Sequence, residues 1–539
     1  MMKYLDKYFK KNPHFFSCRG LDNIDSINEF LYPPKKWLNN PFLFYDMDKA
    51  VNQIVNYPKN RPILIHGDCD ADGVSACGVL TSYLSKIGYN IESYIPNRTL
   101  EGHIISKKAI DFAHTIGCSL IITCDIGMSA KEEVEYAKSK SIKFIITDHH
   151  KINIDTPNAF AIINPWLDEN KDLCFKEYSG SGVAFKLCHA INKKLSLEEN
   201  LIYKLMSIAV IGIISDKVSI KNENRYISLY GYNQIKSGNN LGISLINNRV
   251  SKNKVEININ KIVQIMNMAT KTDDPSIGVK LLTTDNPVQA NKYANIILST
   301  FKKNKLSLTN AIQSAIRQTH AQNYKKNKCI FIISDFDSAY NGAIASRLAF
   351  NFSVPCAVIS RMNDSNFKGS CRSINGINLL SILNLNKNIF LNSGGHPMAA
   401  GFIISEQNIE KFKKIFFEYM ISQTINMVDK KNRIDGEISL ADINSELISM
   451  IKKFRPFGNG NEVPIFKTKN VVLVGSPSIF GADNSSIQFM VEHDKVTLNA
   501  IGFNLINKFE ILLSKNKLDI EYSILIDNDN VNLKVHGIN

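Results

Sequence analysis

The chain has 539 residues, a length that predicts about three to four domains and argues against a minimal single-domain enzyme. Hydrophobic residues make up 44% of it and charged residues 21%, which excludes a mainly disordered chain. The net charge of +14 favours an anionic partner such as nucleic acid. The chain is also rich in Lys, Asn and Ile, as in proteins from AT-biased genomes, so the charge alone does not establish that function.

Three further features bear on where the protein works. No apolar run reaches the 18 or so residues that a membrane span needs. The first ten residues mix charges with aromatics and show no secretion signal. The ten cysteines include no C-x-x-C pair, which argues against a zinc site and against a disulfide framework. Together they predict a cytoplasmic protein without membrane association.

Short apolar runs alternate with longer amphipathic segments from about residue 40 to residue 221. The runs at 62–65, 120–123 and 144–147 predict buried strands, and the segments 74–86 and 130–139 predict helices between them. Strands that alternate with helices in this way form a parallel, doubly wound α/β sheet.

The second half of the chain begins with a long helical pattern from about 286 to 318, which predicts a connecting arm. A second α/β unit follows from about 329 to 419. Beyond residue 433, β-like runs at 470–474, 487–491 and 496–501 are separated by turns, as in a small barrel.

Potential metal ligands follow the predicted strands of the first unit. The first strand leads into His66 and the acidic segment Asp68-Cys-Asp-Ala-Asp72, the second into Asp125, and the third into Asp148-His149-His150. The carboxyl ends of parallel strands meet at one edge of a sheet, so these segments are expected to converge on one pocket. A fourth apolar run, 208–214, ends at Asp216 and would deliver another carboxylate from a strand or helix terminus.

Such a cluster needs cations, because neighbouring carboxylates repel one another and are costly to bury. An oxygen-rich set with some imidazole suits manganese or magnesium better than zinc. Two such ions would activate a water and stabilise the leaving oxygen of a phosphodiester. The sequence therefore predicts a metal-dependent phosphodiester hydrolase.

Other interpretations of these residues were weighed. Asp68, Asp70 and Asp72 resemble the start of a calcium-binding EF-hand loop, but Val79 stands where that loop needs a glutamate. Asp125 or Asp216, taken alone, would be a helix N-cap. At most one of His149 and His150 is expected to meet the first metal, with the other facing substrate.

Two further features, His66 and residues 179–182, have less specific interpretations. His66 has three open interpretations: a ligand, a support for a ligand, or a core histidine. The segment Ser179-Gly-Ser-Gly182 superficially suggests a dinucleotide loop. It lacks a third glycine, so a helix N-terminus is favoured.

These acidic motifs, in this order, resemble the four motifs of the DHH phosphoesterase superfamily. Later segments resemble the RecJ family within it, and Asn164-Pro165 fits the same family. The resemblance covers nearly the whole chain. The later segments are Lys368-Gly-Ser-Cys-Arg-Ser-Ile374, Gly394-Gly-His-Pro-Met-Ala-Ala-Gly401 and Pro456-Phe-Gly-Asn-Gly-Asn461.

The resemblance implies an α/β fold in which a parallel-sheet DHH domain and a smaller DHHA1 domain are joined by a helical connector, with a C-terminal OB-fold β-barrel. An N-terminal extension would precede them. The expected bounds, in chain order, are residues 1–44, 45–230, 231–325, 326–425 and 426–539.

It also implies a single-stranded-DNA-specific exonuclease that works from 5′ to 3′, releases nucleoside 5′-monophosphates and acts in DNA repair and recombination. A single-strand-binding protein would be a partner. Two ions of manganese or magnesium would be held by Asp68, Asp70, Asp72, Asp125, His149 and Asp216, with His150 completing the catalytic set. Substrate would be bound by Arg372, Ser373, Gly394, Gly395 and His396.

Without the resemblance, Arg372 would be assigned to a surface ion pair and the glycine-rich segment to a tight loop.

Some positions depart from the family pattern. Ile126 replaces an asparagine, the segment 336–339 replaces Trp-His-x-Gly, and Thr270-Lys271 replaces Gly-Arg. Two other functions stay open. One is a DHH enzyme for short oligonucleotides, cyclic dinucleotides or pyrophosphate, and the other is a non-catalytic scaffold that binds single strands.

Overall fold

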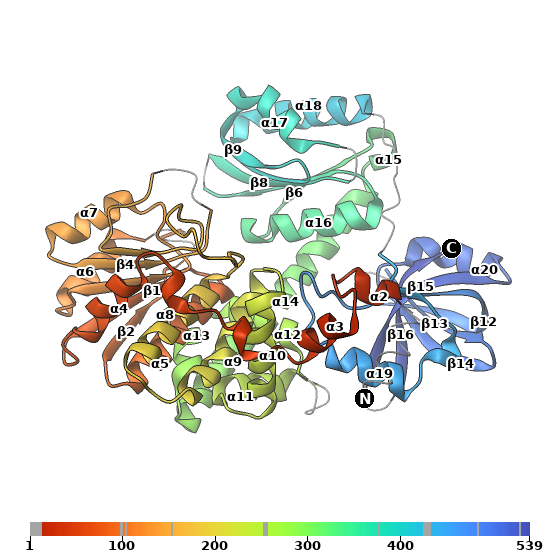
Figure 1. Ribbon diagram of the computed structural model, residues 1–539. Coiled ribbons are helices and arrows are strands. Elements are labelled where there is room, and N and C mark those ends of the chain that lie inside the picture. Colours follow the sequence, from red (N-terminus) through yellow and green to blue (C-terminus); the bar gives the residue numbers. More distant parts are fainter. Residues whose placement is uncertain are drawn as a thin grey trace. The chain divides into compact units, whose positions relative to one another are not determined.

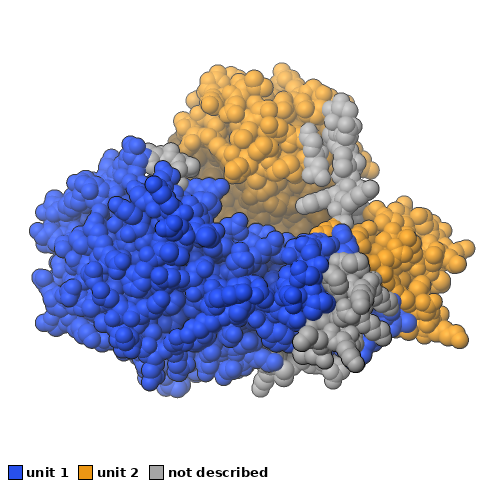
Figure 2. Space-filling model, viewed as in Figure 1, with its two compact units in different colours: residues 1–301, 441–466, 526–530 blue, residues 302–440, 467–525, 531–539 orange. Residues whose placement is uncertain are grey.

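The computed structural model describes residues 13–97, 101–102, 105–151, 155–251, 257–363, 365–374, 377–423, 433–481, 485–527 and 530–539. The predicted N-terminal extension therefore lies partly outside the described residues. The chain divides into two compact units, coloured separately in Figure 2. The first unit comprises residues 1–301, 441–466 and 526–530, and the second comprises 302–440, 467–525 and 531–539. This division differs from the predicted domain bounds, which stay a prediction.

The first unit contains a five-stranded sheet in the order β2-β1-β3-β4-β5, and every pairing in it is parallel (Figure 1). The predicted doubly wound sheet is thus confirmed. Two of its strands were not predicted, because β2 is only half-buried and β5 has three residues. The strands are β1 (Pro62–Gly67), β2 (Asn90–Tyr94), β3 (Leu120–Cys124), β4 (Lys143–Thr147) and β5 (Ala161–Ile163).

Alternate side chains of these strands pack into separate apolar cores on the two faces of the sheet. Ile63 and Ile65 of β1 share a core with α4, α5 and α8, whereas Leu64 shares one with α6 and α7. This alternation follows from the two-residue period of a strand. The helices are α4 (Met47–Val55), α5 (Ala71–Lys86), α6 (Lys107–Thr115), α7 (Lys131–Ser139) and α8 (Gly180–Lys194).

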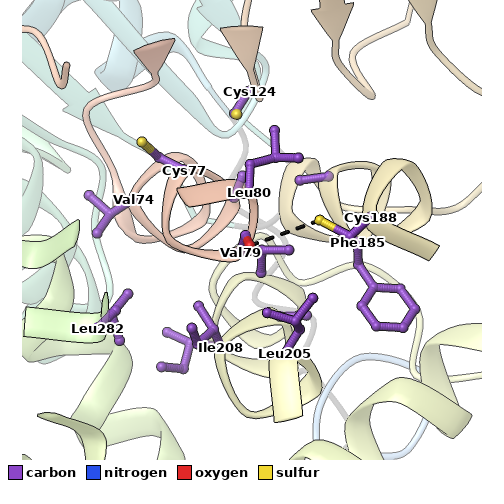
Figure 3. Packing of buried hydrophobic residues seen from close by; sticks show 14 of the residues in the cluster. Val74, Cys77, Val79, Leu80, Cys124, Phe185, Cys188, Leu205, Ile208 and Leu282 are labelled. Atoms are coloured by element: carbon purple, nitrogen blue, oxygen red, sulfur yellow. Dashed lines mark hydrogen bonds between the residues drawn. The ribbon is translucent and has the colours of Figure 1, made fainter. Parts of the chain in front are cut away.

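Helix α5 packs between α8 and α9 (Asn200–Ser215), and Figure 3 shows the side chains at this junction. Leu80 of α5, Phe185 of α8 and Ile208 of α9 are buried there. Helix α9 is largely apolar, as expected of a helix that is buried on most of its sides. The apolar run 208–214 is the C-terminal half of α9, so Asp216 follows a helix and not a strand.

Further helices complete the first unit. A buried arginine on α10, Arg225, donates hydrogen bonds to the carbonyl groups of Phe30, Lys453, Phe454 and Arg455. Burial lowers the pKa of Arg225 to about 9. These bonds connect α10 to the C-terminal end of α19. The helices are α2 (Pro13–Ser17), α3 (Ile24–Leu31), α10 (Asn222–Lys236), α11 (Leu241–Val250), α12 (Ile259–Ala269), α13 (Ile277–Thr283) and α19 (Ser445–Lys453).

Helix α14 (Pro287–His320) begins in the first unit and ends in the second, where the sequence predicts a long helix. The second unit then forms a mixed sheet in the order β6-β7-β8-β10-β9, in which only the β6–β7 pair is parallel. Its strands are β6 (Ile330–Ser334), β7 (Cys356–Arg361), β8 (Asn366–Arg372), β9 (Phe390–His396) and β10 (Ala399–Ser405).

The two faces of this mixed sheet carry different helices. One face packs with α16 and the end of α14, and the other with α17 and α18. A four-residue helix, α15, precedes β6. The helices are α15 (Tyr324–Asn327), α16 (Asn341–Phe352), α17 (Leu379–Leu385) and α18 (Ile409–Ser422).

The C-terminal strands form a closed barrel. The sheet order is β11-β12-β13-β14-β16-β15, and an additional pairing of β12 with β15 closes it. Helix α20 (Phe509–Ser514) lies between β14 and β15 in the chain. No helix in the described ranges has the length and apolar character needed to cross a bilayer. The strands are β11 (Gly436–Glu437), β12 (Phe466–Phe480), β13 (Ser486–His493), β14 (Val496–Gly502), β15 (Leu518–Asp527) and β16 (Asn530–Ile538).

Candidate metal centre

The acidic residues lie at the carboxyl ends of β1, β3 and β4, where the strand order of the first unit changes direction. Strand β2 lies on one side of β1 and β3 on the other, a topology whose ligand crevice opens at the ends of those strands. Asp68 and Asp125 each donate a backbone N–H to the last residue of the neighbouring strand, at 3.2 and 2.9 Å. The backbone ladder thus extends to these two residues and fixes where their side chains begin.

The predicted ligands come together in three overlapping groups. Within each group, one ligand atom from each residue lies within 4.8 Å of the others. Asp125 and His149 each belong to two groups, as expected for residues between two neighbouring cation positions. The groups are Asp68, Asp70 and Asp125; Asp72, His149 and Asp216; and Asp125, His149 and His150.

Asp72 is held by the N-terminus of α8. Its two carboxylate oxygens accept hydrogen bonds from the backbone N–H groups of Gly180 at 2.7 Å and Ser181 at 2.9 Å. The positive end of the helix dipole favours a carboxylate at this position. On α9, a Cβ atom at Gly212 would lie 2.0 Å from Asp72 Oδ1, so only glycine fits there. The predicted helix N-terminus at 179–182 is confirmed, but its role as the support of Asp72 was missed.

Asp125 is buried, and among the described residues only His149 forms an ion-pair contact with its carboxylate. His149 Nε2 lies 3.0 Å from Asp125 Oδ1 but outside hydrogen-bonding direction, so within the described structure this oxygen accepts no hydrogen bond. Burial raises the pKa of Asp125 well above its usual range, and the charges of Asp72 and Asp70 raise it further. A buried carboxylate of this kind fits a divalent cation.

Asp70 caps helix α5 and still takes part in the cluster. Its Oδ1 accepts hydrogen bonds from the N–H groups of Asp72 at 2.9 Å and Gly73 at 3.0 Å. Burial raises the pKa of Asp70. The N-cap interpretation, by contrast, does not apply to the two residues for which it was weighed. Asp125 lies five residues before the cap of α7, and Asp216 is the C-cap of α9.

Asp148 supports the two histidines that follow it. Its Oδ1 accepts hydrogen bonds from the N–H groups of His149 and His150 and lies 2.7 Å from His150 Nδ1. Its Oδ2 accepts one from Met128 N–H. The carboxylate beside it raises the pKa of His150 to about 9, and the His150 side chain is 60% exposed. His150 is therefore a cation that faces solvent at neutral pH. Sequence reasoning gave Asp148 no such role.

The backbone of the histidine pair has a second support. Asn164, which is buried, donates from Nδ2 to the carbonyl oxygen of His150 at 3.0 Å. Its Oδ1 accepts from Trp166 N–H at 2.8 Å. The Asn164-Pro165 motif thus fixes the segment after β4, a role that the sequence alone did not indicate.

His66 is fully buried and belongs to none of the three groups found among the described residues. Its ring stacks on Tyr94 with a centroid distance of 5.3 Å. Burial lowers the pKa of His66 to about 4, so the ring is neutral. The departure at Ile126 has a simple structural account, because this side chain packs into the apolar core beneath α6 and α7.

The predicted substrate-binding residues lie at one end of the mixed sheet in the second unit. Arg372 on β8 and His396 on β9 both pair with Ala399 of the intervening strand β10. Two strand spacings separate them, roughly 10 Å. Gly394 and Gly395 precede His396, and these three residues are exposed.

Arg372 is held by hydroxyl groups and not by a carboxylate. Its Nε donates to Ser346 at 3.0 Å, and its Nη1 donates to Ser370 at 2.9 Å. It makes no ion pair with any described residue, so the surface ion-pair interpretation does not apply. The hydroxyl of Ser373 donates to the carbonyl oxygens of Ile374 and Ile377.

Two of the positions that depart from the family pattern lie near turns. Asp337, in the segment that departs from Trp-His-x-Gly, accepts a hydrogen bond from Ala339 N–H and caps a short turn. Thr270, which precedes Lys271, is buried and donates from its hydroxyl to the Asn267 carbonyl.

Three family models match the chain in sequence order. They are the DHH family N-terminal domain at residues 62–213, the DHHA1 domain at 326–422 and the RecJ OB domain at 434–536. The matched residues include every member of the cluster except Asp216, and all the predicted substrate-binding residues.

Relatives and solved structures agree with these matches. The chain is 29% identical to the single-stranded-DNA-specific exonuclease RecJ of Bacillus subtilis, over 90% of this chain and 62% of the relative. It is 26% identical to the protein of the same name from Haemophilus influenzae, over 95% of this chain and 92% of the relative.

The fold also resembles the crystal structure of RecJ in complex with Mn²⁺ from Thermus thermophilus. The TM-score is 0.77 at 20% identity, over all of this chain and 77% of the other. At this identity the likeness concerns the fold. The three matches follow one another along the chain, which therefore carries segments that match the DHH, DHHA1 and RecJ OB family models.

Proposed function

We propose that the protein is a single-stranded-DNA-specific exonuclease that works from 5′ to 3′ and releases nucleoside 5′-monophosphates in DNA repair and recombination. The observation that carries the proposal is the cluster of carboxylates and histidines at the ends of β1, β3, β4 and α9, in a chain that matches the DHH, DHHA1 and RecJ OB family models. The relatives named as RecJ exonucleases support the substrate and the reaction.

Two divalent cations, manganese or magnesium, are proposed to bind in the cluster. The donor set of carboxylate oxygens with one imidazole suits these ions, and the buried Oδ1 of Asp125 accepts no hydrogen bond within the described structure. When bound, such cations acidify water and neutralise charge on a phosphodiester under attack. The proposed ligands are Asp68, Asp70, Asp72, Asp125, His149 and Asp216.

The protein's own contribution at this centre is rigid placement. The N-terminus of α8 fixes both oxygens of Asp72, and Asp148 orients His150. Because Asp148 occupies Nδ1 of His150, the Nε2–H group of the cationic ring is available to donate to a phosphate oxygen. His150 is therefore proposed to bind and orient the scissile phosphate.

In the second unit, Arg372, Ser373, Gly394, Gly395 and His396 are proposed to bind the DNA backbone near the 5′ end. The supporting observation is that Arg372 and His396 both pair with Ala399 and so lie at the same end of the sheet. Gly395 has φ +139 and allows a backbone conformation that other residues rarely adopt.

The C-terminal barrel is proposed to bind the strand further along, by phosphate contacts and base stacking. Phe503 is half-exposed and contacts Phe480 at a centroid distance of 5.9 Å, which provides an aromatic surface. A single-strand-binding protein that presents the DNA is proposed as a partner, as in the family resemblance. No disulfide bond is formed within the described part of the chain, which supports a reducing, cytoplasmic setting.

Single strands labelled at the 5′ or the 3′ end, with a duplex control, test the proposal in manganese and in magnesium. We expect the 5′ label to appear at once as a mononucleotide and the duplex to resist. Release of the 3′ label first would reject the polarity. Cleavage of only cyclic dinucleotides or very short oligonucleotides would favour the alternative DHH activity. Binding without any hydrolysis would favour the scaffold.

A further inference from the structure

The loop that follows Asp216 is held by a segment far away in the sequence. Asp216 caps the C-terminus of α9, and the next residue, Lys217, has φ +58. This left-handed conformation is uncommon for residues other than glycine. On one side Asp216 is fixed by α9, because its N–H donates to the Gly212 carbonyl oxygen at 2.9 Å. On the other side residues 217–220 connect it to α10, so their conformation also bears on how Asp216 is placed.

Asn459 bonds both ends of this loop. Its Nδ2 donates to the carbonyl oxygen of Lys217 at 2.8 Å, across 242 residues of sequence. Its own carbonyl oxygen accepts a hydrogen bond from Ile220 N–H, also at 2.8 Å. One residue therefore closes the loop that begins immediately after the proposed metal ligand.

The turn that carries Asn459 is itself rigid. Gly458 and Asn461 exchange two backbone hydrogen bonds of 3.0 Å, and the buried Asn461 donates from Nδ2 to the carbonyl oxygens of Phe454 and Pro456. A Cβ atom at Gly458 would lie 2.4 Å from the Ile220 side chain. The turn is thus pressed against the loop and cannot shift without breaking these bonds.

A cavity of about 420 Å³ borders the same loop. It leaves one side of the loop without close packing, so hydrogen bonds are important for the loop conformation. Two of them are made by Asn459, and a third runs from Asn224 Nδ2 to the Ser219 carbonyl oxygen at 2.9 Å. The cavity is lined by Ile213, Ile214, Lys217, Val218, Ile220, Asn260, Gly458 and Asn459.

We propose that Asn459 is a positioning residue for Asp216 and thereby sets the affinity of the metal centre. This rests on the proposed function only in that Asp216 is taken as a metal ligand. The family model assigns residue 459 to the OB domain, whereas its contacts place it in the catalytic unit. Supports of this kind change metal affinity by about 10- to 100-fold when removed.

The test is the affinity for Mn²⁺, measured on the full-length protein by the loss of the free-Mn²⁺ paramagnetic resonance signal. We expect Asp216→Ala to abolish Mn²⁺ binding at the site to which Asp216 contributes. Asn459→Ala should weaken Mn²⁺ binding at the same site by about 10-fold. The Mn²⁺ concentration for half-maximal hydrolysis should rise by the same factor, while kcat at saturating Mn²⁺ changes little. Asn459→Gln, which keeps the amide donor, should restore part of the affinity.

A matched control is Asn192→Ala. Asn192 donates from Nδ2 to the Leu197 carbonyl near the far end of α8, roughly 18 Å along the helix from the residues that hold Asp72. This control should lower Tm without changing Mn²⁺ affinity. Asn459→Leu has nearly the same shape and removes the donor without adding a charge, so it replaces Asn459→Ala should that variant fold poorly.

The outcomes separate the two proposals. Unchanged Mn²⁺ affinity in Asn459→Ala and Asn459→Leu would overturn the positioning role, even with a lowered Tm. Wild-type protein that binds Mn²⁺ but does not hydrolyse DNA would overturn the proposed function and leave the positioning role standing on the binding data. Unaltered binding in Asp216→Ala would overturn the positioning role by removing the ligand on which it acts.

Discussion

The metal centre and the β8–β9 end of the second unit hold their polar residues in opposite ways. At the metal centre, Asp72 and Asp125 are buried and fixed by backbone groups and by glycines with no room for a side chain. On β9, Gly394 and His396 are exposed. Like charges that repel one another need a rigid frame, whereas groups that meet a long polyanion need access. The buried carboxylates are therefore expected to control the rate, and the exposed polar groups the binding of DNA.

The largest expected effect comes from Asp125→Asn, which keeps the shape and removes the charge. We expect hydrolysis to fall about 1,000-fold or more. The metal-free protein should become more stable, with Tm higher by about 2 °C, because repulsion from Asp72 and Asp70 is relieved. Hydrolysis assays and calorimetry in a chelator test both parts. A variant that stays active would contradict the proposed centre.

Gly180→Ala tests whether the frame matters as much as the ligands. The added Cβ would lie 2.3 Å from the Asp125 side chain and would displace it. A shift of about 1 Å at a reacting group lowers activity by about 100-fold. Gly182→Ala is the matched control, because its Cβ would meet only ordinary contacts from 3.4 Å. Equal activity of the two variants would show that the close packing on Asp125 is unimportant.

Asp148→Asn addresses the exposed cation beside the buried cluster. In the wild type, the raised pKa of about 9 keeps His150 charged below that pH. Without the carboxylate, the pKa returns toward the ordinary value near 6.5, so the charge is lost above about pH 6.5. We expect DNA affinity to fall about 10-fold at pH 8 and much less at pH 5.5. A defect independent of pH would instead indicate a purely structural role for Asp148.

Arg372→Ala is expected to have an effect no larger than that of Asp148→Asn, and on substrate binding alone. KM for single strands with a 5′-phosphate should rise about 10-fold, with kcat and Mn²⁺ affinity unchanged, because a charge-assisted phosphate contact is lost. Arg361→Ala is a control on the neighbouring strand, where Arg361 pairs with Glu406 at the other end of the same sheet. A fall in kcat without a rise in KM would contradict the assignment of DNA binding to this end of the sheet.

The sequence predicted the elements whose burial leaves a clear pattern. Strands β1, β3 and β4 are buried along nearly their whole length and therefore appear as continuous apolar runs. The acidic residues of the site follow directly after these strands in the sequence, so they could be predicted from the strand ends. Strand β2 is half-buried and β5 is short, so neither produced a recognisable run.

What the sequence could not predict are the partners of the site residues. Asp72 is held by N–H groups 108 and 109 residues away, and Lys217 by a side chain 242 residues away. Backbone groups carry no sequence signal, and one asparagine among many does not stand out. Asp148 was recognised as part of a motif, but only the geometry shows that it serves the histidines and stands apart from the three groups.

The buried Arg225 bears on how such proteins can be recombined. Three of its four acceptor carbonyls come from residues 453–455, after the point where the OB family match begins at residue 434. A chimera whose junction lies at residue 434 would take residues 453–455 from another protein. The buried guanidinium of Arg225 would then lose three of its four acceptors unless the other protein supplied equivalent carbonyl groups. A junction after residue 466 would carry the acceptors, and the Asn459 turn, along with the catalytic unit. The unit of exchange is thus set by the hydrogen bonds of one arginine rather than by the start of the barrel.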